Sequence, residues 1–389
     1  MKLNLRFKSL DDLLNCDFDE MRMLLDSRFP AFENALAGKQ PVILYPSARL
    51  ARKAAQELQV LGVKVLGFGD GNPALWGTEI DGLRVMSADE IAKNHGDAAV
   101  FVSSVIYDSS IIEKLKAHGI TSIVSVTFLT HKLPDVFFSR DYRNAFDSAA
   151  NPENHAAIRE TYNSLCDEQS RLVFRAKLEY YLTFDKQILS GIESTKPIYF
   201  DSEILPLVPE ESFVDCGAYV GDTLDEFLAA CGGHFKVYYA FEPDTSNYEK
   251  LLALSASDPT RIHPLKFGLA RASGHVRFLS TSTVDARILR NGEEGGESLA
   301  VMSLDDFFAN RPPPTMIKMD IEGSEADALI GASKIIAQSR PKLAISVYHH
   351  PADFWNLPLL MKKLNPSCNL HLRHYGKELA DSVCYAVPE

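Results

Sequence analysis

Several features that would assign a function at once are missing from this chain. Its 389 residues include six cysteines but no CxxC pair, so a zinc ribbon or finger is not expected. No run of 18 or more apolar residues occurs, which predicts no membrane-spanning helix. The N-terminal segment "MKLNLRFKSLDDLLNCDFDE" lacks the apolar stretch of a signal peptide. These absences predict a soluble, cytoplasmic protein with reduced cysteines.

An excess of positive charge is missing as well. The chain has 40 Lys and Arg against 52 Asp and Glu, a formal net charge of -12. A general nucleic-acid-binding protein needs a basic face, so we predict neither a nucleic-acid nor a membrane partner. Homo-oligomer formation is left open. The hydrophobic share of 46% is enough for a packed core, and the length predicts more than one domain.

The pattern along the chain predicts two α/β domains joined by helices. Short apolar runs alternate with helical spacing through residues 40–135, which indicates a parallel sheet in a small Rossmann-like domain. We therefore expect residues 1–135 to form this domain with a helical cap, 136–200 to be a helical linker, and 201–389 to be a second α/β domain.

The second domain restarts the alternation of strands and helices. Strands are expected at 212–215, 237–241, 262–267, 276–279, 316–320 and 342–348. Two further runs, 370–376 and 382–388, are expected to form an antiparallel pair at a sheet edge. The polar, glycine-rich segment 290–298 is predicted to be a loop.

The stretch "FVDCGAYVGDT", residues 213–223, has the form of a strand, a glycine turn and a helix start. It lacks the lysine of a P-loop and the G-x-G-x-x-G of a dinucleotide site. Asp215 and Asp222 flank the turn and would repel a diphosphate, whereas S-adenosylmethionine has no phosphate and two cationic groups. The turn therefore favours this methyl donor. The residues assigned to it are Asp215, Gly217, Ala218, Tyr219, Gly221, Asp222 and Thr223.

Glu242 ends the next predicted strand, in "VYYAFEPD". An acid at this place accepts hydrogen bonds from the two ribose hydroxyls of a bound nucleoside. We assign Glu242 and the neighbouring Pro243 to the donor site. Dinucleotide sites use the same acid, so Glu242 alone does not separate the two cofactors.

A third cluster of acids follows the strand in "MIKMDIEGSEADALIGA", residues 316–332. Asp320 and Glu322 would share a face if the strand continued that far. Carboxylates that lie this close together repel one another, so they need cations, hydrogen-bond donors or a proton-transfer role. Glu322 and Glu325 could instead cap the next helix, and we expect one of them to cap and one to face the site.

His349 follows the strand in "LAISVYHHPADFW". At the carboxyl end of a strand it could act as general base on a hydroxyl, or it could cap a helix that begins near Pro351. We assign His349, Asp320 and Glu322 as candidate catalytic residues. Asp320 and His349 could share a metal, but no ligand spacing requires one, and we predict none.

These segments together resemble the FkbM-type methyltransferases. The matching pieces are "FVDCGAYVGDT", "AFEPD", "GLARASGHVRF", "MSLDDF", "IKMDIEGSEADALIGA" and "SRPKLAISVYHH", which occur in the family's order within residues 198–389. The resemblance implies a class I, seven-stranded methyltransferase fold and S-adenosylmethionine as donor. It also implies transfer to a hydroxyl oxygen, often on a sugar or a related metabolite. Asp215, Gly217, Gly221 and Glu242 would hold the donor, and Asp320 and Glu322 would lie near its methionine end or the acceptor.

The chain departs from this pattern in "AISVYHH", where many relatives have a glutamate before a valine–histidine pair. The N-terminal half resembles the small Rossmann-like domains that precede some of these enzymes. Its first turn, "LYPSARLAR", has no glycine, although Arg49 or Arg52 could contact a phosphate and Asp70 a ribose. The alternative is therefore an NAD-linked or sugar-nucleotide-binding protein that uses this domain and carries a degenerate methyltransferase domain. We favour an S-adenosylmethionine-dependent O-methyltransferase that acts on a sugar or related small metabolite.

Overall fold

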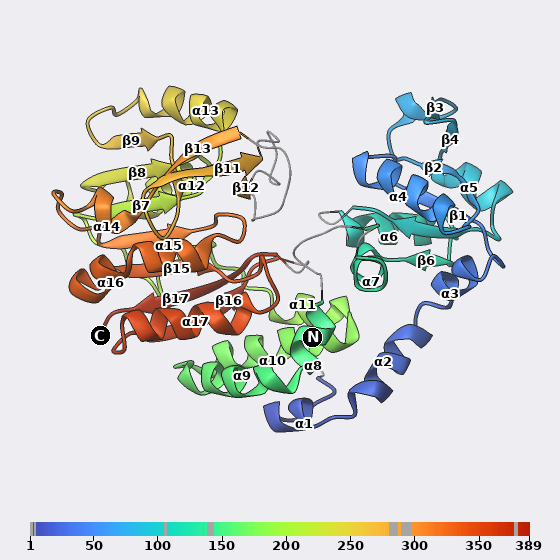
Figure 1. Ribbon diagram of the computed structural model, residues 1–389, viewed down its shortest axis with the longest axis horizontal. Helices are drawn as coiled ribbons and strands as arrows, with labels where there is room; N and C mark the ends of the chain where they lie inside the picture. Colours follow the sequence, from blue (N-terminus) through green and yellow to red (C-terminus); the bar gives the residue numbers. More distant parts are fainter. Residues whose placement is uncertain are drawn as a thin grey trace. The chain divides into compact units, whose positions relative to one another are not determined.

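The computed structural model describes the chain except for residues 1–2, 4, 105–106, 135, 138–143, 280–286, 289–296 and 377–379. Backbone contacts divide the chain into two compact units, which Figure 1 shows in sequence colours. The first unit contains Met1–His155 and Arg175–Gly191. The second contains Ala156–Phe174, Ile192–Gly376 and Ala380–Glu389.

The first unit is built on a mostly parallel sheet. Its strands are β1 (Val42–Tyr45), β2 (Val65–Gly69), β3 (Glu79–Ile80), β4 (Leu83–Met86), β5 (Ala99–Val102) and β6 (Ile123–Val124). They are arranged in the order β3-β4-β2-β1-β5-β6, and β3 pairs antiparallel with β4. Strand β1 pairs in parallel with both β2 and β5. The predicted N-terminal α/β domain is thereby confirmed.

The helices of this unit surround that sheet and extend from it. They are α1 (Leu10–Leu14), α2 (Phe18–Ser27), α3 (Pro30–Leu36), α4 (Arg49–Val60), the 3-10 turn η1 (Pro73–Leu75), α5 (Ala88–Asn94), α6 (Asp108–Ala117), α7 (Val126–Lys132) and α8 (Ala145–Ala150). Helix α4 buries Ala51, Ala54, Ala55 and Leu58, the i, i+3, i+4, i+7 spacing of one helix face. This face packs against β1 and β2.

The segment predicted as a helical linker contains three further helices, α9 (Pro152–Ser164), α10 (Glu168–Thr183) and α11 (Lys186–Ile192). Helix α10 belongs to the second unit up to Phe174 and to the first unit from Arg175.

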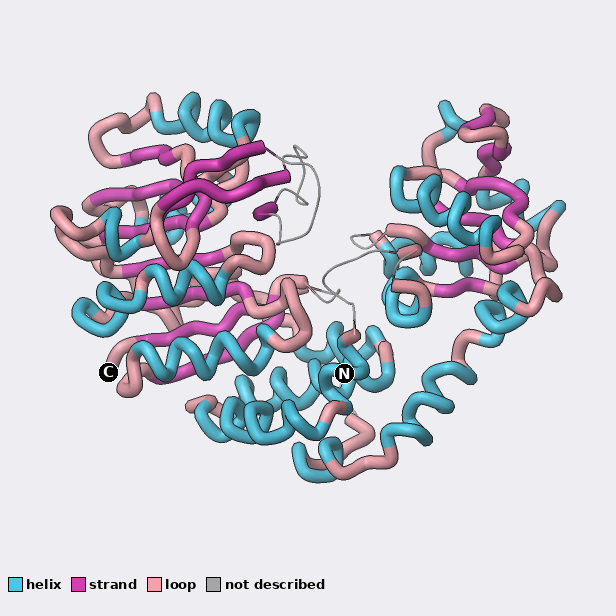
Figure 2. The backbone as a smooth tube through the Cα atoms, viewed as in Figure 1, coloured by secondary structure: helices cyan, strands magenta, loops and turns pink. Residues whose placement is uncertain are grey.

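The second unit contains a seven-stranded sheet, visible as stacked magenta strands in Figure 2. Its strands are β7 (Ser212–Cys216), β8 (Val237–Phe241), β9 (Ile262–Leu265), β14 (Met316–Met319), β15 (Lys342–Ser346), β16 (Asn369–His374) and β17 (Ser382–Val387). The order is β16-β17-β15-β14-β7-β8-β9. Strand β17 runs antiparallel to β15 and β16, and the other neighbours pair in parallel. This is the predicted class I methyltransferase sheet, and the predicted antiparallel pair is present.

Four shorter strands form a separate sheet in the same unit. They are β10 (Gly268–Leu269), β11 (Gly274–Leu279), β12 (Arg287–Ile288) and β13 (Glu297–Met302), in the order β10-β13-β11-β12. Most of the predicted loop 290–298 lies outside the described residues. Its last two residues begin β13, so that part of the prediction is wrong; the antiparallel ladder with β11 holds them in a strand.

Helices complete the second unit. They are α12 (Asp222–Cys231), α13 (Thr245–Ser255), α14 (Leu304–Phe307), α15 (Glu325–Gly331), α16 (Ser333–Ser339) and α17 (Asp353–Leu364). Phe213 of β7, Phe227 of α12 and Tyr238 of β8 are fully buried and pack ring against ring. Each such ring contributes about 1.5–3 kcal/mol of burial energy and fixes α12, and with it the preceding turn, against the sheet. None of the helices in the described ranges is long and apolar enough to cross a membrane.

Candidate functional site

The glycine turn between β7 and α12 lies against the end of β14. Gly217 has φ +83, and a Cβ added there would lie 1.9 Å from the backbone oxygen of Asp320. Gly221 has φ +96 and precedes α12 without a side-chain cap. The backbone N–H groups of Gly217 and Ala218 donate to the carbonyl of Phe241 at 3.0 and 3.1 Å. The turn therefore requires glycine at Gly217 both for its backbone angle and for this close approach.

Glu242 lies beside this turn, as predicted for a donor site. Its carboxylate accepts the N–H of Tyr219 at 3.0 Å and the N–H of Asp244 at 2.9 Å. Only 7% of the residue is exposed, and burial raises the pKa of Glu242 to about 7. The turn and the acid thus form one hydrogen-bonded unit at the carboxyl ends of β7 and β8, where open α/β sheets bind ligands.

Asp215 does not present a free charge to the turn. Lys318 of β14 lies opposite it in the parallel register, and the lysine Nζ is 2.9 Å from the Asp215 carboxylate. The hydroxyl of Tyr238 donates to the other oxygen, and both charged side chains are buried. Lys318 also donates to the carbonyl of Gly217 at 2.8 Å. The charge of Asp215 is therefore compensated internally and gives no reason to exclude a diphosphate, which corrects one ground of the sequence prediction.

The remaining turn residues lie around the start of α12. Asp222 is its first residue and is exposed, whereas Thr223 and Ala218 are buried. Tyr219 has φ +47 and is 38% exposed. Pro243, half-buried, follows Glu242.

The acids after β14 lie on a turn and not on the strand. The strand ends at Met319, so it does not continue far enough for Asp320 and Glu322 to share a strand face. Glu322 has φ +56, and this left-handed backbone redirects the chain. Glu325 begins α15, and its carboxylate accepts the N–H of Ile321 at 2.8 Å. Glu325 thus bonds backbone at the helix start, while Asp320 faces the other acids and a histidine.

His349 lies among all three carboxylates. Its Nε2 is 3.4 Å from Asp320 Oδ1 and 3.7 Å from Glu322 Oε2, and its Nδ1 is 3.0 Å from Glu325 Oε1. Burial lowers the pKa of His349, but Glu325 and the other two carboxylates outweigh it and hold the pKa well above its usual range. Helix α17 begins at Asp353 with Ala352 before it, so the alternative that His349 caps this helix is wrong.

Two tyrosines that the sequence did not single out complete this cluster. Tyr199 donates to Asp320 Oδ2 at 2.9 Å, and Tyr348 donates to Asp320 Oδ1 at 3.0 Å. Burial raises the pKa of Asp320, but His349, Lys318 and these hydroxyls outweigh it, and the pKa lies below its ordinary value. Asp320 is therefore ionised at neutral pH. Because the carbonyl of Asp320 also touches Gly217, the predicted donor turn and the predicted catalytic residues adjoin.

Two of the three N-terminal residues proposed for nucleotide contacts already have partners within their own unit. Asp70 accepts hydrogen bonds from the backbone N–H of Ser47 at 3.0 Å and from its hydroxyl at 2.6 Å. Arg52 forms a two-point ion pair with Asp81 at 2.7 and 3.0 Å. Arg49 is exposed at the start of α4. A ribose or a phosphate would have to displace these internal bonds at Asp70 and Arg52.

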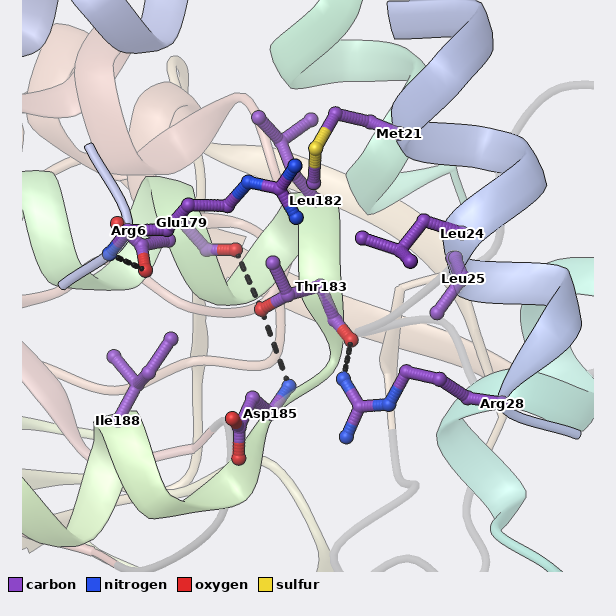
Figure 3. A pocket seen from close by; sticks show the side chains of 10 residues that line it. All are labelled: Arg6, Met21, Leu24, Leu25, Arg28, Glu179, Leu182, Thr183, Asp185 and Ile188. Atoms are coloured by element: carbon purple, nitrogen blue, oxygen red, sulfur yellow. Dashed lines mark hydrogen bonds between the residues drawn. The ribbon is translucent and has the colours of Figure 1, made fainter. Parts of the chain in front are cut away.

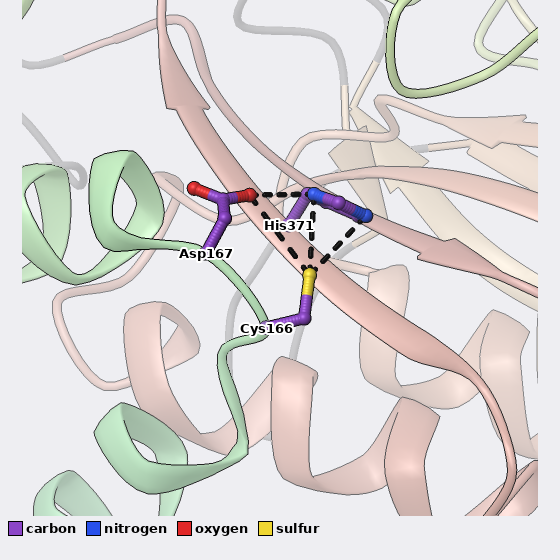
Figure 4. Close-up of side chains that lie close together, drawn as sticks. All are labelled: Cys166, Asp167 and His371. Carbon is purple, nitrogen blue, oxygen red and sulfur yellow. Dashed lines mark hydrogen bonds and ion pairs between the residues drawn. The ribbon is translucent and has the colours of Figure 1, made fainter.

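A second group of metal-ligand types lies between α9 and the edge strand β16 (Figure 4). Cys166 Sγ is 3.2 Å from His371 Nε2, and His371 Nδ1 is 2.6 Å from Asp167. Asp167 also accepts the backbone N–H and hydroxyl of Ser170 at 2.7 and 3.0 Å, and Arg373 lies 3.3 Å away. The carboxylate of Asp167 is thus fully used at the start of α10, and this cluster anchors that helix to β16.

A pocket of about 240 Å³ occurs in the first unit, away from every predicted site residue (Figure 3). Part of its polar lining is bonded internally: Arg28 donates to the carbonyl of Thr183 at 2.6 Å, and Glu179 accepts the backbone N–H of Arg6 at 2.7 Å. The side chain of Arg6 also lines the pocket, and none of its lining residues belongs to a predicted site.

Comparisons with known proteins bear on the family and the fold of the chain. Residues 215–379 match the family model of the methyltransferase FkbM domain. Over 160 residues, the chain is 24% identical to the hexuronic acid methyltransferase AglP of Haloferax volcanii. This alignment covers 40% of this chain and 66% of the relative. The crystal structure of a methyltransferase FkbM from Methylobacillus flagellatus KT superposes with a TM-score of 0.72 and 23% identity, covering 95% of this chain and 98% of that one. At that identity the superposition shows a shared fold. The expected methyltransferase FkbM domain in the C-terminal half is confirmed.

Proposed function

We propose that the methyltransferase FkbM domain transfers a methyl group from S-adenosylmethionine to a hydroxyl oxygen of a sugar or related small metabolite. The observation that supports this most directly is the contact between the two predicted halves of the site. Gly217 of the turn touches the carbonyl of Asp320, whose side chain belongs to the cluster with His349. A donor bound on the turn would thus present its methyl group beside groups that can accept the proton of an acceptor hydroxyl.

The donor would be held by the turn and by Glu242. We assign its contacts to Gly217, Ala218, Tyr219, Gly221, Asp222, Thr223, Glu242, Pro243 and the backbone of Asp320. Asp215 supports the turn indirectly, because its partner Lys318 bonds the carbonyl of Gly217. The ribose hydroxyls would donate to Glu242 in its ionised form.

The reaction would be an in-line displacement. The acceptor oxygen forms a bond to the methyl carbon, the carbon–sulfur bond breaks, and its electron pair neutralises the sulfonium. The hydroxyl proton leaves toward the carboxylates of Asp320 and Glu322, which with the adjacent His349 are our candidate catalytic residues. Alignment of the two reactants supplies about 7–11 kcal/mol of the barrier reduction.

The acceptor class rests on the family and on the relative named for a hexuronic acid. A polyhydroxylated ring can donate several hydrogen bonds to the exposed oxygens of Asp320 and Glu322, whose side chains are 26% and 39% exposed. We propose a supporting or acceptor-binding role for the N-terminal domain, and we keep the boundaries at 135 and 200 and the cytoplasmic location as predictions.

Binding and turnover test the proposal separately. S-adenosylhomocysteine should bind the full chain at micromolar strength in calorimetry, and NAD should not. His349→Ala and Asp320→Ala should keep that affinity within about threefold but lose 10²–10⁴-fold in methyl transfer to a panel of sugars and uronic acids. His234→Ala, an exposed histidine of the same unit, is the matched control and should leave both unchanged.

Binding of NAD in place of S-adenosylhomocysteine would refute the donor assignment. Normal turnover in both site variants would refute the catalytic assignment while leaving the donor assignment intact.

A further inference from the structure

The cluster around His349 carries more negative than positive charge. Asp320, Glu322 and Glu325 surround one imidazole, and the nearby ammonium of Lys318 is already paired with Asp215. Glu325 and His349 are 1% and 2% exposed. Glu325 is buried and Asp320 and Glu322 are partly exposed, so three carboxylates around one imidazole leave a net negative charge that a bound cation would compensate.

The spacing on one side of the ring matches a shell of ligands around a single ion. His349 Nε2 lies 3.4 Å from Asp320 Oδ1 and 3.7 Å from Glu322 Oε2. An ion bound at about 2.0–2.2 Å by a nitrogen and two oxygens separates neighbouring ligand atoms by roughly 3–3.6 Å. Each of the two carboxylate oxygens can therefore contact a cation bound at His349 Nε2 with only small side-chain movements.

The other side of the ring supplies an independent observation. Glu325 Oε1 lies 3.0 Å from His349 Nδ1, yet neither ring nitrogen of this buried histidine makes a well-aligned hydrogen bond. Metal-binding histidines usually direct their second ring nitrogen at a carboxylate, which fixes the tautomer and leaves the first nitrogen free for the ion. Glu325 has the position of that carboxylate.

We propose that His349 Nε2, Asp320 Oδ1 and Glu322 Oε2 bind one divalent transition-metal cation, with Glu325 orienting the imidazole. An imidazole combined with carboxylates suits Mn²⁺ or Zn²⁺ better than Mg²⁺, which prefers oxygen ligands alone. This revises the sequence expectation that no metal site is present. The Cys166 cluster is not an equal candidate, because the guanidinium of Arg373 already supplies a cation to its carboxylate, Asp167.

The role of the ion, unlike its binding, rests on the proposed methyl transfer. The acceptor hydroxyl would occupy an open coordination position beside Asp320 and Glu322. The ion would act as a Lewis acid that lowers the pKa of the acceptor hydroxyl and so favours loss of its proton to water as the methyl group is transferred. His349 would then act as a metal ligand and not as the base.

Metal binding can be measured without an acceptor. The full chain is treated with a chelator, freed of it, and titrated with Mn²⁺, with free ion followed by electron paramagnetic resonance. One equivalent should bind. His349→Ala should weaken binding at least 100-fold, and Glu322→Gln and Glu325→Gln should weaken it about 10–100-fold. His234→Ala and His371→Ala should bind as the unaltered chain does.

S-adenosylhomocysteine binding is measured on the same metal-free samples. If the chain binds S-adenosylhomocysteine but does not bind one equivalent of Mn²⁺ tightly, the metal site is refuted and the methyltransferase proposal stands. The same conclusion follows if His349→Ala binds Mn²⁺ as tightly as the unaltered chain. Tight Mn²⁺ binding without S-adenosylhomocysteine binding would support the metal site and overturn the donor assignment. The isosteric glutamine variants keep the test valid if His349→Ala fails to fold.

Discussion

Gly217 is the residue at which the turn proposed to bind the donor depends on the absence of a side chain. We expect Gly217→Ala to destabilise the fold by about 1–3 kcal/mol and to weaken S-adenosylhomocysteine binding more than tenfold, because φ is +83 and the new Cβ would meet the Asp320 carbonyl at 1.9 Å. Gly233→Ala is the matched control: its φ of +75 imposes similar backbone strain, but no heavy atom lies within 4 Å. Urea unfolding and calorimetry measure the two effects. Equal losses in both variants would show that strain alone matters and that the close contact does not.

Glu242 should make donor binding depend on pH near neutrality. Burial raises its pKa from 4.5 to about 7, so the folded chain holds a proton in this window that the unfolded chain releases. Its contribution to stability therefore falls as pH rises from about 4.5 to about 7. Donor binding needs the ionised carboxylate, so S-adenosylhomocysteine affinity should rise up to about tenfold per pH unit below pH 7 and level off above it.

Glu242→Gln tests the origin of that pH dependence. The amide cannot ionise, and its NH₂ would face either the N–H of Tyr219 or that of Asp244, so affinity should be lower at every pH. Calorimetry between pH 5.5 and 8.5 compares the two proteins. An unchanged pH slope in the variant would assign the titration to another group.

The glycine turn between β7 and α12 and the acid that follows β8 could be predicted because glycine spacing and a strand-terminal acid are local signals. The state of Asp215 could not, since its charge is decided by a residue far along the chain. A clue was present: Lys318 is a lone charge inside the apolar run "MIKM", and a buried lysine needs an acidic partner. The tyrosines on Asp320 gave no such clue, because Tyr199 precedes the sheet and only the tertiary fold brings it there.

Strands β7 and β14 are joined across the sheet by the pair of Asp215 and Lys318. Lys318→Met should cost about 3–5 kcal/mol, because it leaves a buried carboxylate without its cation. The double variant Asp215→Asn with Lys318→Met should be less destabilised than the sum of the single changes, since neither charge is then left alone. Denaturant unfolding of the four proteins gives the coupling energy. Strict additivity would mean that the pair does not stabilise the contact between these strands.

Elements with a strong period were predicted well, and those defined by long-range pairing were not. The strand at 237–241 agrees at both ends, because a short apolar run bounded by polar residues has few other conformations. The strand at 316–320 was predicted one residue too long, and the error mattered: its end at Met319 moves Glu322 to a left-handed turn. The start of strand β13 was predicted to be a loop because its local composition is polar. The antiparallel pairing with β11 makes it a strand, and local composition does not reveal that pairing.

The whole chain contains two units with separate sheets and separate cores. The core of the first includes Ile43, Val100 and Leu115, and that of the second includes Phe213, Tyr238 and Tyr385. Each unit therefore has the apolar cluster that a cooperative folding unit needs. Every residue assigned to the donor site belongs to the second unit.

Ligand binding should consequently stabilise one unit and not the other. At a concentration 100 times its dissociation constant, S-adenosylhomocysteine adds about 2.7 kcal/mol to the unit that binds it. The chain has two tryptophans, the 43% exposed Trp76 in the first unit and the fully buried Trp355 in the second. In Trp76→Phe the remaining fluorescence follows the second unit, and its melting temperature should rise by several degrees with ligand. In Trp355→Phe the signal of Trp76 should melt at the same temperature with and without ligand. A ligand-dependent rise in the melting temperature at Trp76 would mean either that the two units unfold together or that the first unit binds the donor. Calorimetry of Glu242→Gln distinguishes these explanations. Loss of S-adenosylhomocysteine binding would support unfolding as one unit, whereas retained binding would place the donor in the first unit.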